Sequence, residues 1–94
     1  MKAYVIAVID ITDREGYMKD FMPHSLKVIE ASGGKFLVRG GKTAGDHAPK
    51  GRVVVTEYES FEKAVAFEAS AQWQELRKLL SKYGTITNYA VEGV

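Results

Sequence analysis

Residues 2–10 read KAYVIAVID, and this stretch decides the fold that the sequence predicts. A short run so rich in Val and Ile is typical of a β-strand. Side chains alternate across a strand, so the two faces would carry Ala3, Val5, Ala7 and Ile9 on one side and Tyr4, Ile6 and Val8 on the other. Both sets are apolar. We therefore expect this strand to be buried on both of its faces.

A helix is expected after this strand, from Thr12 to about Ser32. The spacing of Thr12 and Glu15 matches a capping box, in which each side chain bonds the other residue's amide. An apolar stripe at helical spacing comprises Met18, Met22, Leu26 and Ile29. Pro23 has no amide hydrogen to donate, so it predicts a kink or a restart near Met22. Gly33-Gly34 would end the helix, with one of the two glycines at positive φ.

The rest of the chain predicts two further strands, a helical region and a last strand. Strands are expected over Lys35 to about Gly40, Arg52 to Glu59 and Thr85 to Glu92, and residues 40–51 form a long glycine-rich loop. Ser60 would cap a helix whose inner face carries Phe61, Ala64, Val65 and the stem of Glu68. Ser70 would cap a second segment with Trp73, Leu76, Leu79 and Leu80 turned inward, and Gly84 would end it. Gly34, Gly40 and Gly41 are further candidates for positive φ.

This β-α-β-β-α-β order predicts one α+β domain over residues 1–94. Right-handed crossovers would give a four-stranded antiparallel sheet with the helices on one face. The other face would then meet water, yet it is apolar at its centre in several strands. Val53 and Val55 oppose Val54 and Tyr58, while Tyr89 and Val91 oppose Ile86 and Ala90. A large exposed apolar patch usually marks an interface, so we expect a homodimer in which two sheets enclose an eight-stranded barrel.

Composition excludes several classes of function. The 94 residues include 13 basic and 12 acidic side chains, for a net charge of +1. That balance gives no field to hold nucleic acid or an anionic membrane. The absence of cysteine excludes disulfides, thiolate nucleophiles and zinc–cysteine sites. The first apolar run is too short for a membrane span and lacks a signal-peptide cleavage site, so a cytoplasmic location is expected.

The stretch Gly33–Gly41, GGKFLVRGG, closely resembles the signature of the domain of unknown function 1330 family. Weaker resemblances follow at Arg52–Tyr58, Ser60–Ala64, Ser70–Gln74 and Val91–Val94, so the likeness spans nearly the whole chain. This resemblance implies a dimeric α+β barrel built from ferredoxin-like protomers. It implies no activity, because the family has none established.

Arg39, Glu57 and His24 are the main candidates for a site. The planar guanidinium of Arg39 suits a carboxylate or another anionic ligand, although a structural salt bridge to Glu57 or Glu92 is the alternative. A half-buried, unpaired Glu57 would have a raised pKa and act as a base, but such a residue is more often paired. His24 follows Pro23 at the helix break, where it would transfer protons if it is not simply a surface residue.

Asp10 and Tyr17 complete the predicted ligand-binding set. Asp10 is a charged group at the end of an apolar strand, and Tyr17 would line a pocket if it does not serve only core packing; the same alternatives apply to Trp73. His47 in the long loop is expected to be exposed. No two potential ligands have a metal-binding spacing, so neither a metal nor a cofactor is expected.

Two functions remain open. The first is a small-molecule site inside the dimeric barrel, for an anionic ligand, which would make the protein a cofactor-independent enzyme if the site is catalytic. The second is a non-catalytic binding or interaction module. An RNA-binding domain is disfavoured because Arg52–Glu57 lacks the aromatic side chains that such a strand needs.

Overall fold

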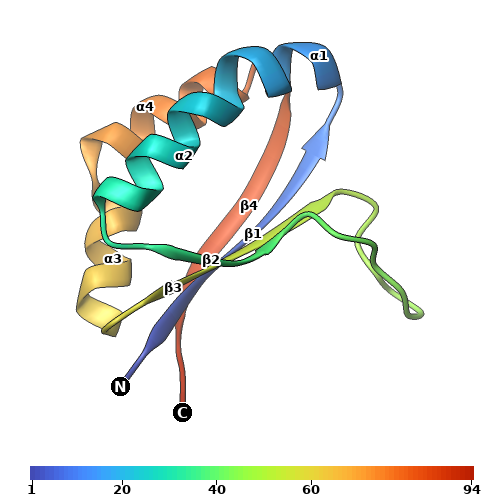
Figure 1. Ribbon diagram of the computed structural model, residues 1–94. Helices are drawn as coiled ribbons and strands as arrows, with labels where there is room; N and C mark the ends of the chain where they lie inside the picture. The colour runs from blue at the N-terminus through green and yellow to red at the C-terminus, as the bar shows by residue number, and fades with distance from the viewer.

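Four strands form one antiparallel sheet in the computed structural model, which describes residues 1–94 (Figure 1). The strands lie in the order β2-β3-β1-β4, so β1, the strand with two apolar faces, is central. Their bounds are β1 Ala3–Ile11, β2 Lys35–Arg39, β3 Arg52–Tyr58 and β4 Gly84–Glu92. All helices lie on one side of the sheet, and the β2–β3 loop extends away from both layers (Figure 1). This arrangement confirms the predicted α+β class, with its antiparallel sheet and its helices on one face.

The two faces of the sheet have different surroundings. On the helix-facing side, Ala3, Val5, Ala7 and Ile9 of β1 are at most 7% exposed. The opposite side, which we call the open face, carries Tyr4, Ile6 and Val8 of β1, Val38 of β2, Val53 and Val55 of β3, and Tyr89 and Val91 of β4. Its central residues are half-buried by their neighbours alone, whereas Val38, Tyr89 and Val91 are exposed. The open face is therefore apolar, as predicted.

The first helical run begins at Asp13 and not at Thr12. The carboxylate of Asp13 accepts a hydrogen bond of 3.0 Å from the amide of Gly16, so the predicted capping box of Thr12 and Glu15 is wrong. The reason is that β1 continues to Ile11 and that the Thr12 amide donates to the Tyr83 carbonyl, 2.8 Å away. Thr12 is thus held beside the chain that enters β4, and the next residue caps the helix.

The run then consists of α1 (Arg14–Gly16), a π-helical segment η1 (Tyr17–Phe21) and α2 (Met22–Ala31). The predicted restart near Met22 is confirmed, with Pro23 in the first turn of α2. The predicted apolar stripe is only partly right, because the wide π turn rotates the helix relative to a regular one. The buried residues are Tyr17, Phe21, Ser25 and Ile29, while Met18 is 45% exposed and Met22 and Leu26 are half-buried.

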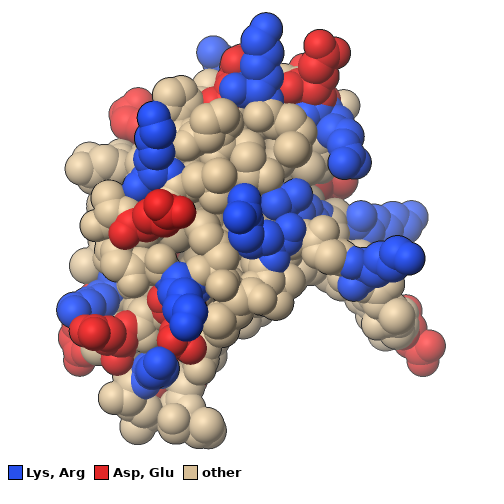
Figure 2. All heavy atoms as spheres, viewed as in Figure 1, with Lys and Arg blue, Asp and Glu red and all other residues tan.

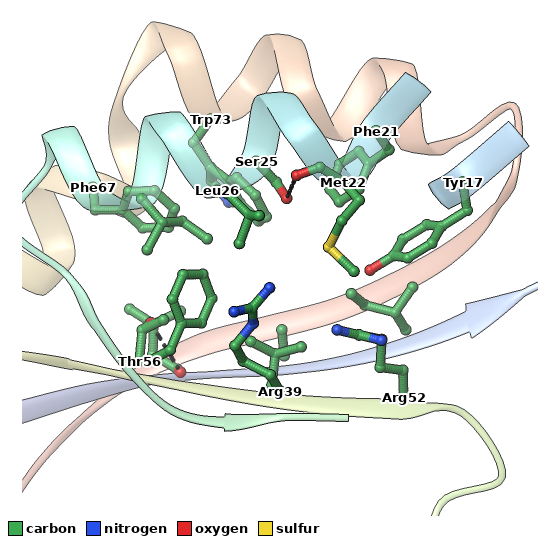
Figure 3. Close-up of a pocket in the computed structure, with 16 residues that line it drawn as sticks. Tyr17, Phe21, Met22, Ser25, Leu26, Arg39, Arg52, Thr56, Phe67 and Trp73 are labelled. Carbon is green, nitrogen blue, oxygen red and sulfur yellow. Dashed lines mark hydrogen bonds between the residues drawn. The ribbon is translucent and has the colours of Figure 1, made fainter. Parts of the chain in front are cut away.

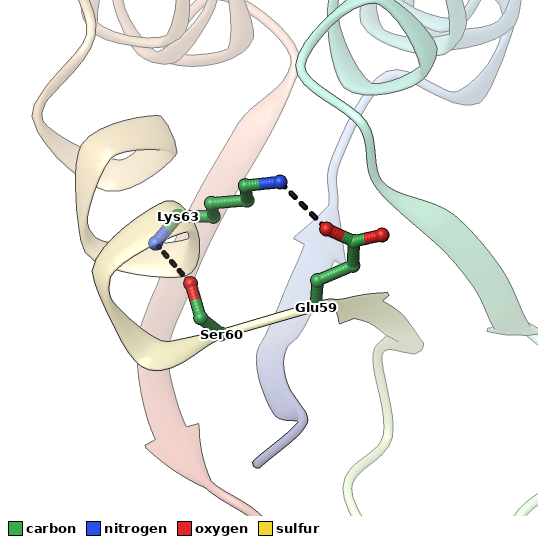
Figure 4. A network of polar contacts seen from close by, with 3 residues as sticks. All are labelled: Glu59, Ser60 and Lys63. Atoms are coloured by element: carbon green, nitrogen blue, oxygen red, sulfur yellow. Dashed lines mark hydrogen bonds and ion pairs between the residues drawn. The ribbon is translucent and has the colours of Figure 1, made fainter.

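The second helical region consists of α3 (Phe61–Ala69) and α4 (Ala71–Leu80), and both predicted caps are confirmed. The Ser60 hydroxyl accepts from the Lys63 amide at 3.2 Å, and the Lys63 ammonium pairs with Glu59 at 2.7 Å (Figure 4). The Ser70 hydroxyl likewise accepts from the Trp73 amide at 3.2 Å.

The predicted inner face of α3 is partly wrong. Ala64 and Phe67 are buried there, whereas Phe61 and Val65 are 39% and 43% exposed. Ala64 has no exposed surface, so its small side chain lets the helix approach the sheet on that side, and Phe61 and Val65 are turned away. In α4, Trp73, Leu76 and Leu80 are buried as predicted.

Positive φ at Gly33 confirms that one of the two glycines after α2 adopts it, and the expectation for Gly40 is also confirmed. Gly45 has positive φ as well, whereas the expectation for Gly34 and Gly41 is wrong. Gly33 ends α2, with its amide donating to the Glu30 carbonyl at 3.0 Å. Gly34 is required for a different reason, since a Cβ there would lie 2.7 Å from the Tyr58 hydroxyl. None of the helices has both the length and the apolar character needed to cross a bilayer.

Candidate functional site

A cavity lies between the helices and the sheet, under η1 and α2 (Figure 3). The α2 helix packs mainly on η1 and α4 and stands off the strands, which leaves this space open. The free volume of this cavity is about 40 Å³. Twelve of the sixteen lining residues are hydrophobic, so a ligand would contact mainly apolar surface.

Hydrogen-bond donors dominate the polar groups of the cavity wall. The Ser25 and Thr56 hydroxyls already use their one proton, since they donate to the carbonyls of Met22 and Val5 at 3.0 and 3.5 Å, and only their acceptor lone pairs remain. Further polar atoms come from Arg39 and Arg52 and, among the twelve hydrophobic residues, from the Tyr17 hydroxyl and the Trp73 indole nitrogen. No aspartate, glutamate or histidine lines the cavity. Arginine and the tryptophan indole can only donate, so the wall is complementary to acceptors and above all to an anion.

Arg39 reaches the cavity because β2 contains a β-bulge. Phe36 pairs with Thr56 and Arg39 with Val54, so both face the helices, although residues three apart in a regular strand face opposite ways. The register shift between Phe36 and Val38 leaves Leu37 as the extra residue that corrects the alternation. The Arg39 guanidinium lies 5.0 Å from the centroid of the Phe36 ring, and the residue is exposed. Arg39 therefore stands at the mouth of the cavity.

Arg52 enters the cavity from the first residue of β3. Its guanidinium carbon lies 6.0 Å from the centroid of the Tyr17 ring, and its buried Nε has no hydrogen-bond partner. Gly40 packs against this side chain, since a Cβ at Gly40 would lie 2.5 Å from Arg52 Cγ. Burial raises the pKa of Tyr17, while the Arg52 cation lowers it to a smaller extent. Tyr17 is thus a neutral phenol at physiological pH, which can donate a proton to a ligand oxygen.

The predicted site residues separate into two groups. Arg39 and Tyr17 line the cavity. Glu57 lies on the open face of the sheet, where its carboxylate pairs with the Lys2 ammonium at 2.8 Å. Arg39 forms no ion pair with Glu57 or Glu92, so the structural salt bridge considered as its alternative role is wrong. Arg39 and Glu57 also face opposite sides of the sheet, so they cannot share a site.

Asp10, His24 and His47 lie away from the cavity. All three are exposed, and Asp10 lines a polar surface pocket together with Arg14, Lys50 and Arg52, the last of which also lines the cavity. These residues do not gather with others into a set of three that could hold a metal ion. His24 lies on the outer surface of α2, and the π turn that precedes it buries Tyr17 and Phe21 instead.

Two lining residues were missed or undervalued in the sequence. Arg52 alternates with Val54 and Tyr58, which were assigned to one face, so the period of two could have placed it beside them. For Trp73 the sequence left pocket lining and core packing open, and both are found: its ring lies tilted against Phe67 with the centroids 5.0 Å apart, and it forms part of the cavity wall. Nothing in the sequence indicates that its indole nitrogen is unpaired.

The site lies on the helix-facing side of the sheet, within one protomer. The small-molecule site was predicted inside the barrel that two open faces would enclose, which is the opposite side. Figure 2 shows Lys and Arg side chains gathered near the middle of the face seen in Figure 1, between the helices and the sheet, with few acidic side chains among them.

Comparisons with known proteins agree with this architecture. A family described as "Domain of unknown function (DUF1330)" matches residues 2–94. No curated protein matches. A protein of unknown function from Rhodopseudomonas palustris is 17% identical, with a TM-score of 0.67 over 99% of this chain and 82% of its own.

Two further solved structures have the same fold. A protein from Nitrosomonas europaea, named as a candidate antibiotic biosynthesis monooxygenase, is 17% identical, with a TM-score of 0.60 over 98% of this chain and 90% of its own. A protein of unknown function from Bacteroides fragilis, described as dimeric and ferredoxin-like, is 15% identical, with a TM-score of 0.61 over 98% of this chain and 96% of its own. At such identities the likeness concerns the fold alone, and it confirms the ferredoxin-like protomer.

Proposed function

Because the chain belongs to the family described as Domain of unknown function (DUF1330), which names no activity, we propose from the cavity itself that it binds a small anion with an apolar body. The anionic group would lie between Arg39 and Arg52, and the apolar body would extend under α2. The proposal rests on one observation: two arginines line a cavity whose wall is otherwise mainly apolar and contains no carboxylate. Arg52 Nε is buried without a hydrogen-bond partner, and Arg39 at the mouth forms no ion pair within the chain, so both are free to bind an anionic ligand.

The chemistry of the wall favours carboxylates. A planar guanidinium binds a carboxylate through two parallel hydrogen bonds, and each charged hydrogen bond contributes about 1.5–3 kcal/mol. The apolar lining includes Met22, Leu26 and Val54. Burial of a hydrocarbon or aromatic part against it would contribute about 25 cal/mol of binding free energy per Å². A small carboxylic acid satisfies both kinds of surface.

Binding is the primary proposal, and catalysis would use the same groups. The cavity has no carboxylate or imidazole to act as a base. A cofactor-independent reaction there would depend on the arginines to stabilise negative charge on the substrate and on Tyr17 to give it a proton. His24 and Glu57, the catalytic candidates from the sequence, have no place in such a reaction because neither lines the cavity.

Calorimetric titration tests the binding proposal. The probes are the straight-chain carboxylates from acetate to octanoate and the aromatic acids benzoate and phenylacetate. Hexanamide, the neutral analogue of hexanoate, is the control ligand and is expected to bind roughly tenfold more weakly or worse. Arg39→Gln and Arg52→Gln are expected to weaken hexanoate binding, whereas Arg77→Gln, the same change at an exposed arginine on α4, is not. If no acid binds, or if hexanoate and hexanamide bind alike, the interaction module becomes the better explanation.

A second copy of the chain is proposed to cover the open face, giving the predicted homodimer. Support comes from the apolar side chains of that face and from the dimeric description of the Bacteroides fragilis protein. Val91 on the open face and Val65 on α3 are 41% and 43% exposed, so they form a matched pair. We expect light scattering to give twice the protomer mass of 10.4 kDa for the unmodified chain and for Val65→Asp, but a smaller mass for Val91→Asp. A monomeric unmodified chain at micromolar concentration would contradict the proposal.

A further inference from the structure

We propose that the cavity has a second polar anchor, the indole N–H of Trp73, and that its ligand carries a hydrogen-bond acceptor at the end away from its anionic group. The inference rests on the proposed function and narrows the ligand class. The predicted ligands are no longer small apolar anions in general. They are bifunctional anions, such as oxo acids, whose carbonyl oxygen would accept a hydrogen bond from the indole N–H.

The unpaired atoms of the protein point to this anchor. Only two buried side-chain nitrogen or oxygen atoms in the chain lack a hydrogen-bond partner, and they are Trp73 Nε1 and Arg52 Nε. A buried donor without a partner is strongly disfavoured, and most buried polar atoms in proteins are paired. Both atoms belong to residues that line the same cavity. Two unpaired donors from residues of one cavity indicate that a polar ligand supplies the missing acceptors. Unrelated packing defects would not be expected to fall at the same cavity twice.

The position of Trp73 suits the far end of a ligand. Its side chain descends from α4 in the helix layer, whereas Arg39 and Arg52 rise from the sheet (Figure 3). The residue is 4% exposed, and its ring is held against Phe67 at 5.0 Å. The Ser70 hydroxyl fixes the first turn of α4 by accepting from the Trp73 amide. The indole is therefore rigidly placed and cannot turn its N–H toward solvent.

No group of the protein offers the missing acceptor. The cavity wall has no carboxylate, and the hydroxyl oxygens of Ser25 and Thr56, which could accept, form no hydrogen bond with the indole nitrogen. The indole N–H is a donor only, so it cannot bind a cation or another donor. A neutral carbonyl oxygen fits this position better than a second carboxylate, since the cationic groups lie on the opposite, sheet wall of the cavity.

Binding and NMR measurements on the intact protein test the inference. The probes are acetoacetate, levulinate and 5-oxohexanoate, each compared with butyrate, pentanoate or hexanoate of the same chain length. Since Trp73 is the only tryptophan, the nitrogen–proton spectrum contains a single indole resonance. At least one oxo acid is expected to bind roughly three- to tenfold more tightly than its parent acid. The same oxo acid should move the indole proton downfield, which the parent acid should not do.

Replacement of Trp73 by benzothienylalanine, which keeps the ring shape but lacks the N–H, is the matched control. Trp73→Phe is a simpler second variant. Both variants are expected to bind each oxo acid no more tightly than its parent acid.

The outcomes separate this inference from the proposed function. If parent acids bind and no oxo acid is preferred, the anchor is refuted while the anion site stands. If the preference survives benzothienylalanine, another group donates to the carbonyl oxygen and the anchor is again refuted. If no acid of either series binds, both proposals fail.

Discussion

Gly40→Ala should damage the cavity through Arg52, and Gly33→Ala provides a control with the same backbone strain. Both glycines have positive φ, 78° at Gly40 and 91° at Gly33. An alanine in this region costs about 1–2 kcal/mol, partly offset by about 0.4–1 kcal/mol from the stiffer unfolded chain. A Cβ at Gly33 meets nothing within 4 Å, whereas one at Gly40 lies 2.5 Å from Arg52 Cγ and 2.9 Å from Arg52 Nε. Overpacking of that kind adds about 1–3 kcal/mol, so Gly40→Ala should be the less stable variant by that amount.

Urea denaturation at equal protein concentrations measures this difference, because the stability of an oligomer depends on concentration. Titration with hexanoate measures the second effect, since a displaced Arg52 should bind the anion more weakly in Gly40→Ala only. Equal losses of stability in the two variants, with hexanoate affinity retained in both, would refute the proposed contact between Gly40 and Arg52.

Three further predictions concern stability. Ser70→Ala removes the acceptor for the Trp73 amide and should cost about 1 kcal/mol in urea denaturation; a change within error would show that the cap is not needed. Leu80→Ala, at a fully buried residue, should cost about 2–5 kcal/mol, whereas Val65→Ala on the exposed side of α3 should cost far less; similar losses would contradict the assigned core. Burial raises the pKa of Tyr58, so its contribution to stability is complete below the unfolded pKa of about 10 and is lost as pH rises through the higher folded pKa. Urea midpoints should therefore fall above about pH 10, and less steeply in Tyr58→Phe; identical slopes would exclude Tyr58 as a cause.

The order and type of the elements could be predicted from the sequence because they depend on short-range patterns. Local signals predicted a strand from the apolar run of residues 2–10 and the end of a helix from the glycines after residue 32. They also predicted helix starts from the serines at 60 and 70. The placement of the helices on one face then follows from the handedness of crossovers and not from any single residue.

Details that depend on packing could not be predicted. The π turn at Tyr17–Phe21 shifts the buried stripe from Met18 to Tyr17, and both stripes are apolar in the sequence. The partner of Glu57 is Lys2, which is 55 residues away in the chain and adjacent only because β1 pairs with β3. Sequence spacing carries no trace of either relation.

The candidate site was half predictable for a similar reason. The chemistry of Arg39 marked it as a candidate in the sequence, but the direction of its side chain depends on the bulge at Leu37. In a strand with a strict period of two, Arg39 and Phe36 would face opposite sides of the sheet. A cavity exists only because α2 stands off the sheet, which no local pattern encodes.

The alternation of β3 has a consequence for how this protein can evolve. Arg52, Val54 and Thr56 contribute to the cavity, while Val53 and Val55, interleaved with them, contribute to the open face. Single substitutions can therefore change the proposed ligand site without changing the proposed dimer interface, and the reverse also holds. An insertion or deletion of one residue within β3 would exchange the two sets at once. Selection should thus tolerate many replacements in this strand and almost no change in its length.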